Sequence, residues 1–150
     1  MQQIYTDPVE SYCNTREELR FSSLLLLDKA IEQSELNGSI HNPCTCIKLD
    51  RAAFVQELKD NEGLLGVEEG AEDSVLEHDI SALMNATLAW RDEEGILHQC
   101  NVLGSGFVHH EYIQLRLSYT FAMLVAVMQG KKPDIKKIFA DPRNFACAEN

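Results

Sequence analysis

The chain has 150 residues, a length typical of one compact domain and short for two. Apolar residues make up 45% and charged residues 25%, with only eight Gly and four Pro, so the chain can build a hydrophobic core. The 24 acidic and 13 basic side chains leave a net charge of −11, which disfavours binding to nucleic acid or to an anionic membrane.

The cysteines and the first residues favour a reducing compartment. Met1–Pro8 contains neither a basic nor an apolar segment, so we expect no secretory signal peptide. The longest apolar run, Phe121–Met128, has eight residues, whereas about 20 are needed to cross a bilayer. An odd number of cysteines cannot all pair within one chain, so we expect reduced thiols at Cys13, Cys44, Cys46, Cys100 and Cys147. We therefore expect a cytoplasmic protein that is not inserted in a membrane.

The first predicted helix begins at Thr15–Glu18, which has the form of a capping box, and ends at Leu36 before Asn37 and Gly38. Leu24–Leu27 lie on all sides of this helix, so we expect it to be packed on several sides. Residues 38–49 form a predicted loop, with a short extended piece at 45–49.

Two further helices are predicted before residue 86. Asp50 is expected to cap a helix over 51–60, and the capping box Ser74–Glu77 is expected to begin a helix that ends near Asn85. The periodicity places their apolar faces inward: Phe54, Val55, Leu58, Leu76, Ile80, Leu83 and Met84.

From residue 86 the apolar pattern has a period of two. Runs at 86–91 and 96–103 flank an acidic turn that ends in Gly95, and they predict a β-hairpin. A lone hairpin is only marginally stable in water, so we expect it to pack on the helices or to join another strand.

The last predicted element is a long helix over 108–129, preceded by a flexible connector at Gly104–Gly106. Phe121–Met128 is apolar on every side and is expected to be central in the core; a buried strand is the alternative, which the length disfavours. Residues 133–139 are expected to add one helical turn, and 1–12 and 141–150 are expected to be loosely ordered. The sequence thus predicts an α+β, helix-dominated single domain over 1–150, with four main helices and one hairpin packed on them.

His41, Cys44 and Cys46 form the segment most similar to a metal site, because thiolates and imidazole are ligands of Zn²⁺. The spacing is Cys-x-Cys, and no second pair of cysteines follows. We therefore favour half-buried thiols beside a turn, and expect no metal and no cofactor. A redox-active pair, with thiol pKa values lowered by Lys48 and Arg51, is a further alternative to inert buried thiols.

His98, His109 and His110 are candidate ligand or acid–base groups. The segment His110–Gln114 lacks the second His of a His-Glu-x-x-His zinc motif. Together with Cys100, these histidines would line a pocket between the hairpin and the last long helix.

Charge is unevenly distributed along the chain. Between Glu57 and Asp79 there are nine acidic residues and one basic residue, Lys59. A solvated loop is the simpler interpretation, and a contact for a basic partner protein is the functional one. The candidate partner-binding residues are Glu57, Asp60, Glu62, Glu68, Glu69, Glu72 and Asp73. The opposing basic cluster comprises Lys131, Lys132, Lys136, Lys137 and Arg143.

Three functional hypotheses follow. The first is a noncatalytic acidic protein that binds another protein, as an inhibitor, immunity protein, chaperone or adaptor does, because no catalytic motif is complete. The alternative is a small-ligand sensor or enzyme that uses the His and Cys pocket. The third is a homodimer that packs through Leu24–Leu27 or Phe121–Met128, which is compatible with either of the others.

Overall fold

In the computed structural model, which describes residues 5–37, 45–68 and 70–128, two helices precede the first strand. Helix α1, Pro8–Glu17, begins where Asp7 Oδ1 accepts the Val9 amide at 2.9 Å and Pro8 occupies the first turn. Helix α2 spans Phe21–Asn37. The predicted start at Thr15 is therefore wrong, because Thr15 is buried inside α1. Residues 8–12, expected to be loosely ordered, are helical.

The next two helices agree with the sequence in most respects. Strand β1, Cys46–Asp50, falls on the predicted extended piece, and Asp50 Oδ1 accepts the Ala53 amide at 2.8 Å to cap α3, Arg51–Asp60. Helix α4 spans Glu72–Asn85 and has no side-chain cap, so the predicted capping box at Ser74 is wrong. Leu76, Ile80 and Leu83 are buried as predicted, but Met84 is 36% exposed.

The predicted hairpin is confirmed. Strands β2, Thr87–Arg91, and β3, Leu97–Asn101, pair antiparallel with Trp90 opposite His98. The hairpin packs on α1, where the Ala89 amide donates to Ser11 Oγ at 3.1 Å. It therefore lies on a helix, as expected of a two-stranded ribbon.

The long helix predicted over 108–129 is wrong in its first half. The chain instead forms β4, Leu103–Val108, and β5, Tyr112–Leu117, before helix α5, Tyr119–Met128. Buried residues alternate with half-buried ones along β5, which is the period of a strand with one face on the core. The predicted connector at Gly104–Gly106 is likewise wrong, because it lies within β4.

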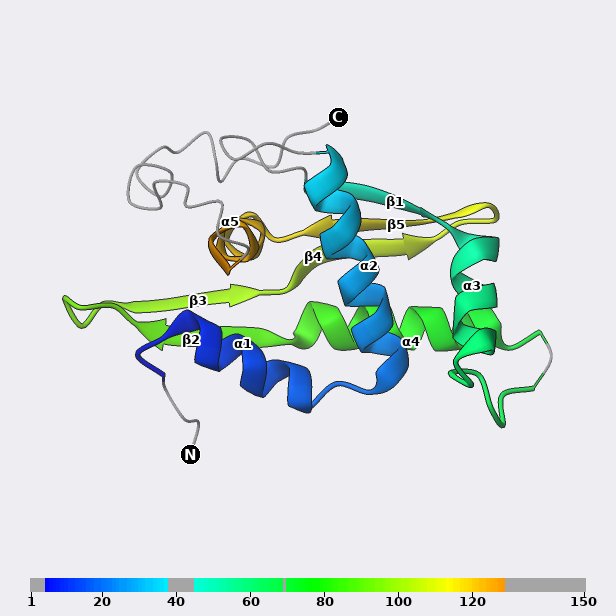
Figure 1. Cartoon of the computed structure of the whole chain (residues 1–150), viewed down its shortest axis with the longest axis horizontal. Helices are drawn as coiled ribbons and strands as arrows, with labels where there is room; N and C mark the ends of the chain where they lie inside the picture. Colours follow the sequence, from blue (N-terminus) through cyan, green and yellow to red (C-terminus); the bar gives the residue numbers. More distant parts are fainter. Residues whose placement is uncertain (1–4, 38–44, 69, 129–150) are drawn as a thin grey trace.

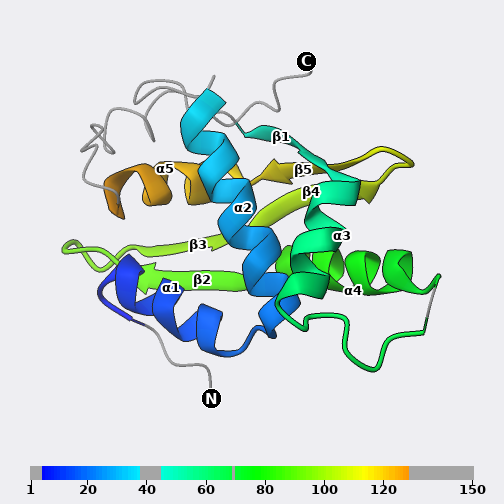
Figure 2. The ribbon, with the colours of Figure 1, turned by 45° about the vertical axis from the view of Figure 1, so that its right-hand side comes forward.

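The larger sheet has the order β1-β5-β4, with both pairs antiparallel. Helix α2 lies across β1 and α4 (Figures 1 and 2). Helix α4 packs on β4 so closely that a Cβ added to Gly106 would lie 2.6 Å from Ile80 Cγ2. Both helices therefore cover the same face of the sheet, and the core lies between these helices and that face.

The fold is α+β, with five helices and two antiparallel sheets among the described residues. Helix α2 contacts α3, α4, α5 and β1, which confirms that it is packed on several sides. Leu26, Leu27 and Phe121–Val125 are buried, whereas Leu24 and Leu25 are half-buried. None of the helices in the described ranges is long and apolar enough to span a membrane. Residues 133–139 and 141–150 lie outside those ranges.

Candidate partner-binding surface

Helix α3 ends in a Schellman motif that turns the chain sharply toward α4. The Gly63 amide donates to the Leu58 carbonyl at 2.6 Å, and the Glu62 amide donates to the Lys59 carbonyl at 3.1 Å. Glu62 adopts a φ of 60°, the left-handed conformation that glycine usually takes at this position. This motif fixes where the segment between α3 and α4 leaves the helix.

A cavity of about 370 Å³ lies along this segment. It combines apolar and charged side chains from Lys59, Glu62, Leu64, Leu65, Val67, Glu68 and Glu72. Leu64 packs against the core, whereas Leu65 is 82% exposed. Half-exposed Phe21, at the start of α2, lies against the turn at Gly63. We call the cavity and its acidic surroundings, residues 57–68 and 70–73, the acidic surface.

The structure divides the predicted partner-binding residues into two groups. Glu57 lies 3.1 Å from Lys29 Nζ and raises the pKa of Lys29. Asp73 pairs with Arg51, and Asp60 accepts a hydrogen bond from Gln56 at 2.9 Å. These three carboxylates therefore have partners within the chain. The others, Glu62, Glu68 and Glu72, line the cavity, and Glu69 lies outside the described residues.

Asp79 does not contribute to the acidic surface. It belongs to the acidic stretch in sequence, but its side chain is fully buried and pairs with Arg20 Nε at 2.8 Å. The sequence carries no local signal for the Arg20–Asp79 pair, because the pairing depends on how α2 packs on α4.

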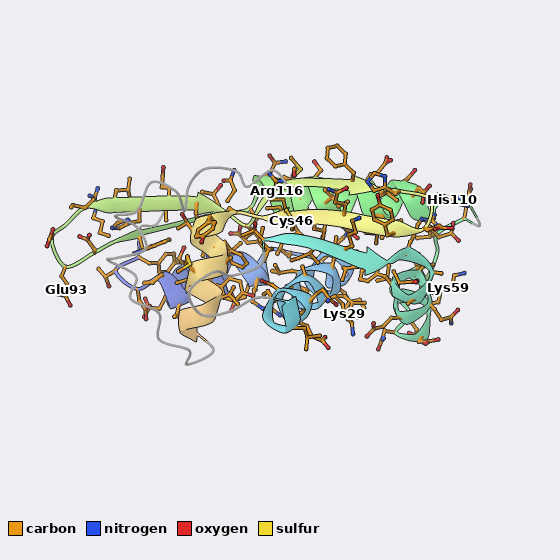
Figure 3. The ribbon with its side chains drawn as sticks, turned by 90° about the horizontal axis from the view of Figure 1, so that it is seen from above. Lys29, Cys46, Lys59, Glu93, His110 and Arg116 are labelled. Atoms are coloured by element: carbon orange, nitrogen blue, oxygen red, sulfur yellow. The ribbon has the colours of Figure 1, made fainter. Side chains whose placement is uncertain are left out.

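The structure does not bring the candidate histidines together. His98 Nε2 lies 2.9 Å from Asp92 Oδ2, and the His98 ring stacks on Trp90. At the β4–β5 turn, His109 Nε2 lies 3.1 Å from Gln114 Oε1. His110 is exposed at the same turn. The β2–β3 and β4–β5 turns lie at opposite ends of the molecule, as the labels Glu93 and His110 show in Figure 3.

The cysteines form no recognisable redox or metal site in the described part of the chain. Cys13, Cys46 and Cys100 do not take part in a disulfide bond. Burial raises the pKa of the Cys100 thiol to about 12, which opposes formation of a nucleophilic thiolate. Arg116 Nη2 donates to Cys46 Sγ at 3.5 Å. No group of three or more His, Cys, Asp or Glu within the described ranges is arranged to hold a metal ion, while His41 and Cys44 lie outside those ranges.

A second cavity, of about 380 Å³, lies between the ends of α1 and α4. Its lining is Thr15, Glu18, Leu19, Ala82, Asn85, Ala86 and Thr87, which include neither His nor Cys. Comparison of the chain with protein-family models, curated proteins and solved structures finds no match. We therefore infer what the acidic surface can do from its own residues.

Proposed function

We propose that the chain is a noncatalytic, cytoplasmic protein that binds another protein through the acidic surface. The observation that carries this proposal is Leu65, 82% exposed among the carboxylates of Glu62, Glu68 and Glu72. An exposed leucine beside a hollow is a suitable anchor for a partner, since full burial of its side chain contributes about 2 kcal/mol. Cysteines without disulfide bonds, as at Cys13, Cys46 and Cys100, suit a cytoplasmic location.

The carboxylates define the chemistry of the partner. Three acidic side chains and one lysine line the cavity, so a partner with basic residues around an apolar side chain complements it. Such charges mainly raise the rate of association and select the partner, while the buried apolar contact limits dissociation. The partner is therefore a protein with a basic rim around an apolar centre.

The enzyme or sensor alternative has less support. It requires histidines that converge on one pocket, but His98 is engaged with Asp92 and Trp90 on the β2–β3 hairpin, whereas His109 and His110 lie at the β4–β5 turn. Cys100, the thiol assigned to that pocket, is buried.

The test uses the full chain, immobilised, to capture proteins from the native host at low salt. Any protein recovered in stoichiometric amount is purified, and its affinity is measured by calorimetry for the wild type, Leu65→Ser and Ile96→Ser. Ile96 is a matched control, because it is an exposed aliphatic residue in the β2–β3 connection. We expect Leu65→Ser to weaken binding about tenfold, as loss of an apolar anchor does, and Ile96→Ser to have little effect.

Two outcomes contradict the proposal: recovery of no stoichiometric partner, or equal affinity of the two variants. Light scattering on the same samples tests the homodimer separately. A monomer at micromolar concentration excludes self-association as the source of a captured complex.

A further inference from the structure

The second cavity, between the ends of α1 and α4, has a lining suited to a small ligand. Its volume of about 380 Å³ falls within the range of small-molecule sites in proteins. Helix α1 ends at Glu17 and helix α4 at Asn85, so two helices have their C-terminal ends at this place (Figure 1). We call it the helix-end cavity. The acidic surface lies at the other end of α4, about 20 Å away along the 14 residues of that helix.

The two helix ends give the cavity a negative potential. The last carbonyl groups of a helix lack partners within the helix and carry a partial negative charge. Helix α4 has Glu72 and Asp73 in its first turn but no basic residue in its last turn, so none of its own side chains offsets this charge. The last turn of α1 contains Arg16, whose guanidinium is already paired with Asp28 at 2.6 Å. Both helix ends therefore favour a cation.

The side chains of the lining add to this potential. Among the described residues of the lining, Glu18 alone carries a charge, and it is exposed. Glu17, beside it in sequence, is also exposed. Arg20, the nearest cation along the chain, is paired with the buried carboxylate of Asp79 at 2.8 Å, so these two charges offset each other. A ligand that complements the cavity is therefore a cation, which the net charge of −11 also attracts.

The oxygen atoms of the lining favour a ligand that donates hydrogen bonds. The Thr87 hydroxyl donates to Asn101 Oδ1 at 3.0 Å, so its oxygen is left to accept from a ligand. Thr15 and Asn85 contribute a hydroxyl and a side-chain amide to the same lining. An ammonium group has three donors and no acceptor, and it therefore matches these oxygens.

The remainder of the lining is apolar. It consists of Leu19, Ala82 and Ala86, against which a short aliphatic chain can pack while its charged end stays among the oxygens. A divalent metal ion fits less well, because Ca²⁺ and Mg²⁺ are held by several hard oxygen ligands, whereas this lining supplies one carboxylate. The lining thus favours an organic cation with an aliphatic chain.

We propose that the helix-end cavity binds a primary alkylammonium group. The ammonium lies between the Glu18 carboxylate and the end of α4, and the aliphatic chain packs on Leu19 and Ala82. A small free amine and the side chain of a lysine share this chemistry, and the experiment below separates the two sources. This proposal does not depend on the function of the acidic surface, which lies at the other end of α4.

The test uses the full chain and putrescine, with amide chemical shifts to locate binding. Butanediol of the same chain length lacks the charge, and an acetylated lysine methylamide presents the ammonium on a lysine side chain. Magnesium chloride at equal ionic strength reports nonspecific attraction of cations. We expect putrescine to shift the amides of residues 15–19 and 82–87 with half-saturation at about 1–10 mM, and the diol and Mg²⁺ to cause no saturable shift.

Glu18→Gln should weaken binding of putrescine about fivefold, the scale of one exposed ion pair. Glu17→Gln is the matched control, because it removes the same charge from the neighbouring exposed position, which is not part of the lining. It should leave binding within about twofold of the wild type.

Ala82→Leu should weaken binding at least about tenfold, because the larger side chain fills the cavity without a change in charge. Ser81→Leu places the same side chain at the preceding exposed position of α4 and should have little effect. Thermal unfolding verifies that each variant folds.

The proposal is overturned if putrescine shifts none of these amides at about 50 mM, well above the expected half-saturation. It is also overturned if the diol or Mg²⁺ binds as tightly as putrescine, or if Glu17→Gln weakens binding as much as Glu18→Gln does. Tighter binding of the lysine derivative than of putrescine supports the alkylammonium chemistry and assigns its source to a lysine side chain. Binding of a captured partner to the acidic surface is measured independently with Leu65→Ser, so failure of one proposal does not affect the other.

Discussion

Asp79 is fully buried on α4, and its Oδ1 accepts hydrogen bonds from Arg20 Nε at 2.8 Å and from Ser23 Oγ at 2.9 Å. Its other oxygen, Oδ2, is buried without a hydrogen-bond partner in the described part of the chain. A buried carboxylate is costly unless it is paired, so α4 depends on the residues that join α1 to α2. The Arg20–Asp79 pair thus connects the N-terminal helices to the helix that covers β4.

Arg20→Met should lower the free energy of unfolding by about 2–3 kcal/mol, because it leaves the Asp79 carboxylate buried and unpaired. This value is below the usual cost of breaking a buried pair because the Arg20 side chain is half exposed. The double variant Arg20→Met/Asp79→Leu should recover at least half of the loss. Urea unfolding at neutral pH measures both. Equal losses for Arg20→Met and for Arg91→Met, a variant of an exposed arginine, would refute the argument.

Gly106→Ala should destabilise the fold by about 1–3 kcal/mol, the usual cost of overpacking. The new Cβ would lie 2.6 Å from Ile80 Cγ2 and 3.1 Å from Leu115 Cδ2, where α4 meets β4. Gly104→Ala is the control two residues earlier in the same strand, since its nearest contact would be 3.8 Å away. Thermal unfolding should therefore separate the two variants. Similar midpoints for both would show that α4 does not approach β4 so closely.

Local signals predicted those parts of the fold that local contacts decide. Asp50 caps α3 with its own side chain, and the turn after Trp90 closes with a hydrogen bond from the Gly95 amide to the Asp92 carbonyl. The start of α1 was also marked locally, by Asp7 and Pro8. The prediction of loose order for residues 1–12 gave this signal too little weight.

The region from Gly104 to Leu117 could not be assigned in the same way. It contains no Pro and no Gly after Gly106, and it runs directly into the apolar residues of α5, so a continuous helix fits its local composition. The alternation along Tyr112–Leu117 favours a strand, but β5 is stable because it lies between β1 and β4. The β1 partner is distant in sequence, as the pairing of Cys46 with Arg116 shows.

The candidate surfaces also combine features that the sequence predicts locally with features that depend on tertiary contacts. The acidic residues of 57–73 were evident from composition, since a run of carboxylates needs no tertiary information. Which of them are paired depends on Lys29 in α2 and on Arg51 at the start of α3. The outer face of the β1-β5-β4 sheet was not predicted, because Lys48, Gln114 and Phe107 are brought together only by strand pairing.

The hairpin should lose stability in acid through Asp92. His98, followed by the backbone amides of Ile96 and Glu94, holds the pKa of Asp92 below its ordinary value of 3.8. A lowered native pKa means that Asp92 stabilises the fold above pH 3.8, and that this contribution disappears as the pH falls through the lowered value. Asp92→Asn should therefore reduce the difference in unfolding free energy between pH 7 and about pH 3.

Urea unfolding at both pH values checks this expectation, with Glu93→Gln as the control at the neighbouring exposed position. If Asp92→Asn and the wild type lose the same stability in acid, the Asp92–His98 contact makes no net contribution.

Glu62→Gly should stabilise the fold by about 0.5–1 kcal/mol, because glycine adopts the left-handed conformation without the steric cost of a side chain. Glu62 occupies that conformation at the end of α3, with a φ of 60°. Gly63→Ala should have the opposite effect, since its Cβ would lie 2.9 Å from Leu58 Cδ2 and 3.1 Å from the Leu58 carbonyl oxygen. Chemical unfolding of each variant measures the change in its free energy of unfolding, and a destabilised Glu62→Gly would contradict the assignment of strain.

Because Glu62 also lines the cavity of the acidic surface, Glu62→Gly should bind a basic partner more weakly although it is more resistant to denaturant.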